Sequence, residues 1–421
     1  MEIRFLKQVA VATADIAETK IQNHSIPPRS QIKHLAKKIL CAAFSLFPVQ
    51  KRTVLFYVHE KKGLCGNAKY IIRRLSEGKC HPGRGLRILY ATRFPEAVDA
   101  GLKKELGINV IKYPGVRWLH ALSTCGILVT DDGVSGLHRK RSGQTFISSW
   151  HGGGAFKEVG FGTARDGGRL AYLHSLYDPL DYMVVGCLRN VADYSRAFGL
   201  EKWRIKPLGM PRTDVFFDPG GIKDAEGRVR GFYSIPSDKK IVLFAPTFRN
   251  DSEVFLGTRE IGTVLGAFSE SLGRPAVCLY RSHYLDSRSV SVPSGEDIID
   301  ASAYPDAQEL VCAASALVSD YSSIMYDFAL MKKPVFLLQR NPEKYVRNNR
   351  DFFIEPARWP FAISGSIPGL CGSIRGFDRG LYDEKVGEFM EAIGSVDDGK
   401  SSERSTEFIR RLVTMGTGGQ Q

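Results

Sequence analysis

The chain has 421 residues, of which 43% are hydrophobic and 24% charged, and no apolar run approaches the ~20 residues that span a bilayer. This length predicts two domains, and the formal net charge of +13 predicts an anionic partner. No zinc finger, helix-turn-helix or RNP-like sequence is visible, so we expect no nucleic-acid partner, and a phosphorylated substrate or an anionic membrane surface remains.

The cysteines and the N-terminus indicate a compartment. The eight cysteines are scattered, without a CxxC pair or a metal-ligand spacing, which is typical of reduced and mostly buried thiols in the cytoplasm. The N-terminal MEIRFLKQVAVATADIAETK lacks a small-residue cleavage site after an apolar core, so we expect no signal peptide. We also expect no cofactor and no metal site, because no acidic metal-binding triad is evident, although metal dependence stays open.

The N-terminal segment, residues 1–52, contains a predicted basic amphipathic helix. Residues 31–52, QIKHLAKKILCAAFSLFPVQKR, combine Lys33, Lys37 and Lys38 with apolar residues on helical spacing. Such a helix can lie on an anionic membrane surface with its apolar face in the headgroup region, which predicts peripheral attachment to the inner face of the cell membrane. The alternative is a helix whose apolar face packs on the neighbouring domain.

From Thr53 onward, short apolar runs alternate with helix-like stretches, which is typical of parallel sheets covered on both faces. Helices are predicted at 67–75 and 96–106. The first series of predicted strands covers 53–58, 87–91, 109–113, 125–130 and 145–149. The second series covers 240–245, 276–280, 298–300, 316–319 and 334–338.

A glycine-rich and charged stretch at about 215–235 separates the two series and indicates a domain boundary. We therefore predict an α/β protein with two Rossmann-like domains, 53–220 and 221–393, whose parallel sheets face a central cleft as in the GT-B architecture. Residues 394–421 are predicted to form a short last helix and a mobile tail. Ligands of open α/β sheets bind outside the carboxyl ends of the strands, so functional residues should directly follow strands.

The segment SWHGGGAFKEVG at 149–160 is the first candidate site. His151 falls at the carboxyl edge of a predicted strand, and an imidazole, which titrates near ~6.5 in a free peptide, can take the proton of an acceptor hydroxyl. Gly152, Gly153 and Gly154 permit a close approach to the backbone, which suits a bound phosphate together with Lys157. The alternative is a structural histidine that caps a turn.

Basic residues and hydroxyls follow other predicted strands. In LGMPRTD, Arg212 is a candidate phosphate ligand, although this motif taken alone is more typical of a structural turn. In APTFR, Thr247 and Arg249 follow a strand and are predicted to hold the phosphates of a donor. In RSH, His283 is predicted to donate to a phosphate or leaving group, and an ordinary loop histidine is the alternative.

The segment VSDYSSIMYDF at 318–328 predicts an anion site. The strand 316–319 turns at Asp320, and Ser322 and Ser323 begin a helix whose free N–H groups and dipole favour an anion such as a pyrophosphate. The alternative is a helix cap without a ligand.

Together these segments resemble the CDP-glycerol glycerophosphotransferase family, the teichoic-acid and capsule polymerases and primases. Family members carry WH-x-x-GAFK-x-x-G, G-x-PRTD, APTFR, R-x-H and DYSS segments in this order. They appear here as WHGGGAFKEVG, GMPRTD, APTFR, RSH and SDYSS over residues 150–323, and GNAKYIIRRL at 66–75 extends the resemblance. The order of five motifs is specific, whereas each motif alone is weak.

The resemblance implies a GT-B fold with a CDP-polyol donor in the C-terminal domain. It implies that His151 is the base and that His283, Arg249, Ser322 and Ser323 hold the donor's phosphates. The implied reaction transfers a polyol phosphate, with glycerol 3-phosphate expected, to a hydroxyl of a glycan or lipid-linked acceptor, a growing teichoic-acid-like or capsular polymer, and releases CMP.

The sequence departs from the family at two places, and the second, a loop near the alcohol end of the donor in such folds, leaves the polyol open. Ser315 stands where the family often has an aspartate, and the loop 353–361 lacks the usual Pro-Gly-Pro ending. Two other functions stay open as well: a GT-B glycosyltransferase that uses a nucleotide sugar, and a catalytically silent scaffold that binds polyanions.

Overall fold

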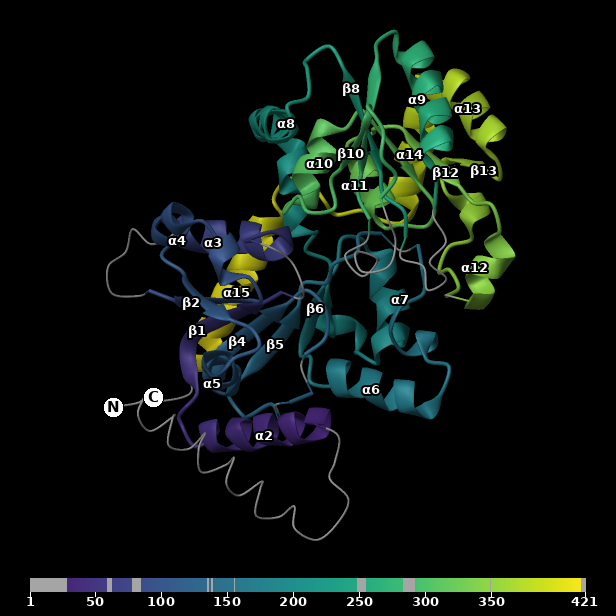
Figure 1. Ribbon diagram of the computed structural model, residues 1–421. Coiled ribbons are helices and arrows are strands. Elements are labelled where there is room, and N and C mark those ends of the chain that lie inside the picture. The colour runs from purple at the N-terminus through teal and green to yellow at the C-terminus, as the bar shows by residue number, and fades with distance from the viewer. Residues whose placement is uncertain are drawn as a thin grey trace.

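Two parallel sheets with helices against them form two domains, the first in the lower part and the second in the upper part of Figure 1. The computed structural model describes residues 29–58, 63–77, 85–134, 136–137, 139–154, 156–247, 255–282, 292–348 and 350–417.

The first domain contains a seven-stranded parallel sheet in the order β3-β2-β1-β4-β5-β6-β7. Alternate residues of its central strand enter two cores: Leu55 and Tyr57 pack with residues of α2 and α5, and Val54 and Phe56 pack with residues of α3 and α15. Burial on both faces explains why these strands are apolar throughout. The strands are β1 (Gln50–Tyr57), β2 (Arg87–Thr92), β3 (Asn109–Lys112), β4 (Cys125–Thr130), β5 (Thr145–Ser148), β6 (Tyr182–Val184) and β7 (Ile205–Lys206). The helices are α2 (Arg29–Phe44), α3 (Gly66–Glu77), α4 (Ala100–Leu106), α5 (Val116–Thr124), α6 (Gly167–Tyr177) and α7 (Arg189–Phe198).

The second domain repeats this plan with a six-stranded parallel sheet in the order β10-β9-β8-β11-β12-β13. Ile241 and Leu243 of its central strand enter one core, and Val242 and Phe244 enter the core on the opposite face. The strands are β8 (Lys240–Phe244), β9 (Ala276–Tyr280), β10 (Ile298–Asp300), β11 (Ala316–Ser319), β12 (Val335–Leu338) and β13 (Ala362–Ser364). The helices are α8 (Pro219–Tyr233), α9 (Thr258–Leu272), α10 (Ala307–Ala313), α11 (Ile324–Leu330), α12 (Pro342–Asn348), α13 (Ile367–Arg375) and α14 (Arg379–Ala392).

The predicted α/β class with two Rossmann-like sheets is confirmed. In each sheet the strand order reverses beside the first strand, between β1 and β4 and between β8 and β11. Such a switch point is where open α/β sheets bind ligands, outside the carboxyl ends of the strands. β6, β7 and β13, which are short strands toward one side of each sheet, were not predicted from the sequence.

The N-terminal helix is shorter than predicted. α2 ends at Phe44, and Lys51 and Arg52 belong to β1 instead, because the chain turns after α2 to enter the sheet. Phe44 is buried and meets the ring of His120 edge-on, with 5.3 Å between ring centroids. The C-terminal half of α2 therefore packs on the first domain, whereas Leu35 nearer its start is 55% exposed. None of the described helices is long and apolar enough to cross a membrane.

The C-terminal segment differs from the predicted mobile tail. After α14 the chain crosses back to the first domain and forms α15 (Ser401–Thr417), which lies behind the first sheet in Figure 1. Ile409 and Val413 of α15 are buried in the core that contains Val54 and Phe56. α15 is therefore a structural part of the first domain, and residues 418–421 of the predicted tail lie outside the described residues.

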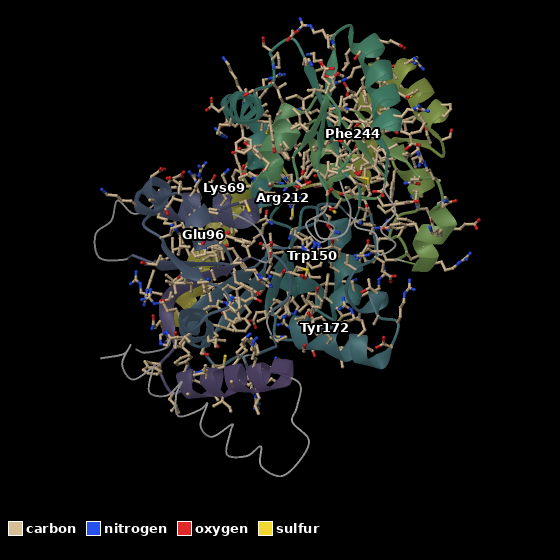
Figure 2. The ribbon with its side chains drawn as sticks, in the orientation of Figure 1. Lys69, Glu96, Trp150, Tyr172, Arg212 and Phe244 are labelled. Carbon is tan, nitrogen blue, oxygen red and sulfur yellow. The ribbon has the colours of Figure 1, made fainter. Side chains whose placement is uncertain are left out.

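Buried ion pairs join the two domains. Lys69 of α3 contacts Asp306 at 2.5 Å and Glu309 at 3.3 Å, and Arg212, in the turn that ends the first domain, contacts Asp327 of α11 at 2.8 Å. The exposed fractions of the Arg212 and Asp327 side chains are 7% and 3%. Figure 2 shows Lys69 and Arg212 close to the second domain. Since isolated buried charges are costly, these pairs fix how the domains meet.

We expect Asp327→Ala to lower the free energy of unfolding by about 3–5 kcal/mol, because it leaves the guanidinium of Arg212 buried without its counter-charge. Urea unfolding followed by circular dichroism measures this change. Glu407→Ala is the control, since the Glu407–Arg411 ion pair on α15 is exposed, and it should cost less than about 1 kcal/mol. Equal losses for the two variants would contradict the assigned importance of the interdomain pair.

Candidate functional site

His151 lies at the carboxyl edge of the first sheet, where the sequence placed it, and its side chain is exposed. Its Nδ1 lies 2.9 Å from the carbonyl oxygen of Asp131, the residue after β4. A carbonyl oxygen only accepts hydrogen bonds, so Nδ1 carries the hydrogen in this contact. In a neutral imidazole, Nε2 then holds the free lone pair. The ring is therefore held in the tautomer that a general base requires.

The residue before His151 has an unusual backbone. Trp150 has a φ of 44°, in the left-handed region that costs a non-glycine residue on the order of 1 kcal/mol or more. Its side chain is 4% exposed and packs edge-on against Phe198, with 4.9 Å between ring centroids. The ring of His151 lies 4.6 Å from that of Trp150. The buried indole thus anchors the turn from which the histidine projects.

The three glycines after His151 let this turn approach the second domain. A Cβ atom at Gly153 would lie 2.2 Å from the Tyr326 ring, and one at Gly154 would lie 2.9 Å from it. These two glycines are buried, so the structure gives them a packing role. Gly152 is half-buried, and a Cβ atom there would lie 3.7 Å from Oγ of Ser323. The His151 turn therefore faces the start of α11.

Lys157 lies in the same junction. Its backbone pairs antiparallel with Phe352, in a loop of the second domain. Burial, reinforced by the positive charge of Arg350, lowers the pKa of Lys157 to about 7, and the negative charge of Asp320 acts in the opposite direction. An anion that binds beside Lys157 would stabilise its charged form and raise its pKa.

Thr247 and Asp320 follow β8 and β11, the two strands at the switch point of the second sheet. The Asp320 carboxylate is fully buried and accepts hydrogen bonds from the Thr247 N–H at 2.8 Å and the Thr247 hydroxyl at 2.7 Å. Asp320 therefore holds the Thr247 loop in place. Ser322 and Ser323 are half-buried, and neither hydroxyl donates to another described residue in the contacts that the structure gives.

Arg212 has a different environment from the predicted one. Its guanidinium donates to Asp327, and its backbone N–H donates to the side chain of Asn67 at 3.0 Å. Arg212 therefore connects the two domains. This is the role of a structural turn, which the sequence offered as the alternative to a phosphate ligand. Arg249 and His283 lie outside the described residues. The structure thus brings together His151, Gly152, Lys157, Thr247, Asp320, Ser322 and Ser323.

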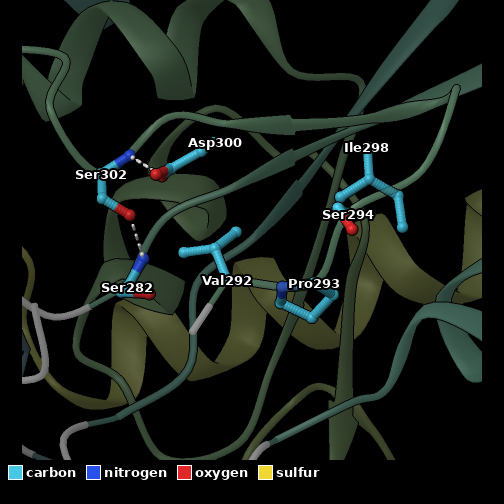
Figure 3. Close-up of a pocket in the computed structure, with 7 residues that line it drawn as sticks. All are labelled: Ser282, Val292, Pro293, Ser294, Ile298, Asp300 and Ser302. Carbon is cyan, nitrogen blue, oxygen red and sulfur yellow. Dashed lines mark hydrogen bonds between the residues drawn. The ribbon is translucent and has the colours of Figure 1, made fainter. Parts of the chain in front are cut away.

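A separate cavity of about 420 Å³, lined by both polar and apolar residues, lies near the carboxyl ends of β9 and β10 (Figure 3). Ser282, the residue before His283, lines it together with Asp300 and Ser302. The Ser302 hydroxyl accepts from the N–H of Ser282 at 3.0 Å, and the Asp300 carboxylate accepts from the N–H of Ser302 at 2.8 Å. The cavity thus offers hydroxyl and carboxylate groups at the sheet edge where the second domain is expected to bind ligands.

Within the described part of the chain, no three His, Cys, Asp or Glu side chains gather as metal ligands. The cysteines found there are buried and form no disulfide.

Two residues of this region were missed as site residues. Asn67 appeared only within the weaker GNAKYIIRRL similarity, and Arg350 belongs to no motif. Asn67 binds the His151 turn from a helix more than eighty positions earlier, and Arg350 acts on Lys157 from the other domain. Contacts between residues so far apart in the chain leave no local pattern in the sequence.

Comparison with known proteins identifies the family of this chain. The sequence profile of the CDP-Glycerol:Poly(glycerophosphate) glycerophosphotransferase family matches residues 39–411. The chain is 27% identical over 391 residues to the teichoic acid ribitol-phosphate primase of Bacillus spizizenii. This alignment covers 90% of this chain and 96% of the primase. The chain is 32% identical over 374 residues to the teichoic acid ribitol-phosphate polymerase TarL of Staphylococcus aureus. This alignment covers 86% of this chain and 62% of TarL.

A solved structure of the wall teichoic acid polymerase TagF, a variant soaked with CDPG, superposes with a TM-score of 0.77 and 25% identity. The superposition covers 92% of this chain and 98% of the TagF chain. The predicted GT-B fold is therefore confirmed. Since the family profile extends from α2 into α15, this chain belongs to the CDP-glycerol:poly(glycerophosphate) glycerophosphotransferase family and is a transferase.

Proposed function

We propose that this protein transfers a polyol phosphate, glycerol 3-phosphate in the first instance, from a CDP-activated donor to a hydroxyl of a growing teichoic-acid-like or capsular polymer. The observation that carries the proposal is the position of His151. Its Nδ1 is bound to the Asp131 carbonyl, which leaves Nε2 to accept a proton, and its turn faces Ser323 of the other domain. Family membership favours this reaction over glycosyl transfer and over a silent scaffold.

In the proposed reaction, the acceptor hydroxyl gives its proton to Nε2 of His151 as its oxygen attacks the β-phosphorus of the donor. A new oxygen–phosphorus bond forms, the bond from the β-phosphorus to the bridging oxygen breaks, and CMP leaves with that oxygen. Phosphoryl-type transfer depends mainly on positioning and charge neutralisation.

The donor phosphates are assigned to the junction between the His151 turn and the carboxyl edge of the second sheet. Lys157 supplies positive charge there, and Ser322 and Ser323 supply hydroxyl donors, whereas Thr247, whose N–H and hydroxyl both donate to Asp320, lines the site beside them. Asp320 positions Thr247 and does not contact the donor in this proposal. The family resemblance adds Arg249 and His283 as further phosphate ligands.

The proposal is tested by incubating the protein with CDP-glycerol, CDP-ribitol and a panel of nucleotide sugars, together with a teichoic-acid-type acceptor. We expect CMP release and a phosphodiester-linked product. UDP release with a glycosidic product would favour the glycosyltransferase, and no release from any donor would favour the scaffold.

His151→Ala should lower kcat by roughly 10²–10⁴-fold, which is the usual contribution of general-base catalysis, while donor affinity changes little. CMP release under saturating donor measures kcat, and calorimetry with CMP measures affinity. His174→Ala is the matched control, because His174 is a half-exposed histidine on α6 that pairs with Asp178. A His151→Ala enzyme with more than half of the wild-type kcat would remove this residue from the mechanism.

Lys157 gives a pH-dependent prediction. Its pKa of about 7 lies below the ~10.4 of an unfolded lysine, so between these values the unfolded chain binds the extra proton and stability rises with pH. The same shift leaves its amine largely neutral above pH 7. We expect acetylation of Lys157 by acetic anhydride to rise through a midpoint near pH 7, measured by peptide mass spectrometry.

A bound phosphate stabilises the ammonium form, so saturation with CMP should move this midpoint to higher pH. Lys385, exposed on α14, is the internal control, because CMP should not change the extent of its acetylation. A Lys157 midpoint well above pH 7 in the absence of CMP, or one that CMP does not move, would contradict the assignment of Lys157 to the donor phosphates.

We also propose that the first domain binds the anionic inner face of the cell membrane. Lys33 and Lys38 are exposed on α2, beside the exposed Leu35. At the same lower end of the molecule, α6 presents Arg169 over the ring of Tyr172, whose side chain is 51% exposed (Figures 1 and 2). Basic residues beside exposed apolar and aromatic ones are typical of interfacial attachment.

Charge reversal at Lys33, Lys37 and Lys38 should release the protein from vesicles that contain anionic lipid, since each basic residue contributes ~1 kcal/mol near such a surface. Cosedimentation measures binding, and high salt should have the same effect. Charge reversal at Lys223, Lys332 and Lys385, exposed lysines of the second domain, is the control and should preserve binding. Binding that is insensitive to salt, or no binding by the wild type, would contradict this proposal.

A further inference from the structure

The side chain of Asn67, near the start of α3, connects three segments of the first domain. Its Nδ2 donates to the carbonyl oxygens of Ser149 and Trp150, both at 2.7 Å, and its Oδ1 accepts from the N–H of Arg212 at 3.0 Å. The residue is 4% exposed. Both hydrogens of the amide group and its oxygen are thus used in bonds to the main chain.

These bonds act on the strained part of the His151 turn. Trp150 has the left-handed φ of 44°, and its carbonyl belongs to the peptide group that connects it to His151. An amide donor on that carbonyl fixes the orientation of this peptide group, and with it the direction in which the His151 side chain leaves the backbone. A strained conformation persists only where surrounding contacts determine it, and Asn67 supplies two of these contacts.

Asn67 also lies where the His151 turn meets the second domain, in which the donor is proposed to bind. Two residues after Asn67, Lys69 forms the buried contacts with Asp306 and Glu309 of the second domain. The main-chain N–H that Asn67 binds belongs to Arg212, which pairs with Asp327 across the same junction. α3 therefore contacts the histidine turn and the donor-binding domain through neighbouring residues.

We propose that Asn67 is a positioning residue for the transfer reaction, which orients His151 through the Trp150–His151 peptide group. The inference rests on the proposed function, because it requires His151 to be the base. The position requires an asparagine, because a carboxylate at the same place would present an oxygen to two carbonyl oxygens. An aliphatic side chain there would leave buried polar groups unpaired.

The chain contains a matched control for this substitution. Gln144 is a buried amide whose Nε2 donates to the carbonyl oxygens of Leu122 and Cys125, at 3.1 and 2.8 Å, and whose Oε1 accepts from the N–H of Arg141. It precedes β5 and so lies at the amino edge of the sheet, whereas His151 follows the carboxyl end of the same strand. Gln144→Glu therefore makes the same chemical change as Asn67→Asp away from the site.

The experiment compares Asn67→Asp with Gln144→Glu in the CMP-release assay, with thermal unfolding of each variant. We expect kcat of Asn67→Asp to fall ~10²-fold, as for a small misplacement of a catalytic group, with KM for the CDP-polyol within about twofold of the wild type. Gln144→Glu should keep kcat within about twofold. Similar losses in the two variants, or a loss confined to KM, would overturn the inference.

Combining Asn67→Asp with His151→Ala provides a readout that a merely structural role would not change. If Asn67 acts through His151, the double variant should be no slower than His151→Ala alone, because there is no base left to position. A further loss of the same ~10²-fold would show that Asn67 acts independently and would overturn the inference.

Asn67→Ser serves if Asn67→Asp does not fold, since its shorter side chain removes the two carbonyl contacts without adding a charge. It should lower kcat at least ~10-fold at unchanged KM, and a wild-type kcat would overturn the inference. A wild type that releases no CMP, or an active His151→Ala, overturns the proposed function itself. An active wild type with a fully active Asn67 variant overturns only the role of Asn67.

Discussion

The close approach of the His151 turn to Tyr326 is the contact on which the site depends. The ring occupies the space that a side chain at Gly153 would need, so the backbone of the first domain lies directly against α11 of the second. The Tyr326 hydroxyl continues the connection, since its oxygen lies within hydrogen-bonding distance of the Asp397 carboxylate at 2.7 Å and of the Gly186 carbonyl oxygen at 3.1 Å. One aromatic side chain thus ties the histidine turn, the first sheet and the crossing to α15 into one junction.

Polar residues hold this junction together and leave other groups for substrate. Arg212, Lys69 and Asp320 are buried and bonded to partners inside the protein, so they maintain geometry. Lys157 differs from them, because burial lowers its pKa and the positive charge of Arg350 lowers it further. A site for a charged donor requires both kinds of group: fixed charges that set the distance between the domains, and a charge whose stabilisation depends on an anion.

The sequence predicted most strands of each sheet and missed the strands at one side of it. β4, β9, β10 and β11 have the predicted boundaries, because strands that are buried or flanked by turns leave continuous apolar runs. The short β6, β7 and β13 were missed, since two or three residues carry little periodicity of their own. The end of α2 was placed too late, because the basic and apolar pattern continues from the helix into β1.

Local order in the chain determined which residues follow strands, and this was enough to place His151, Thr247, Asp320, Ser322 and Ser323 at carboxyl edges. Only the tertiary structure decided what each of them contacts. Arg212 looked like a phosphate ligand, but it is paired with Asp327, and Gly153 looked like an open backbone, but it packs against Tyr326. The contact of Asn67 with the Trp150 carbonyl could be identified only from the tertiary structure, in which α3 lies beside the Trp150 turn. The reason is physical: a residue's type and neighbours fix its chemistry and its element, whereas its partner is chosen by how distant elements pack.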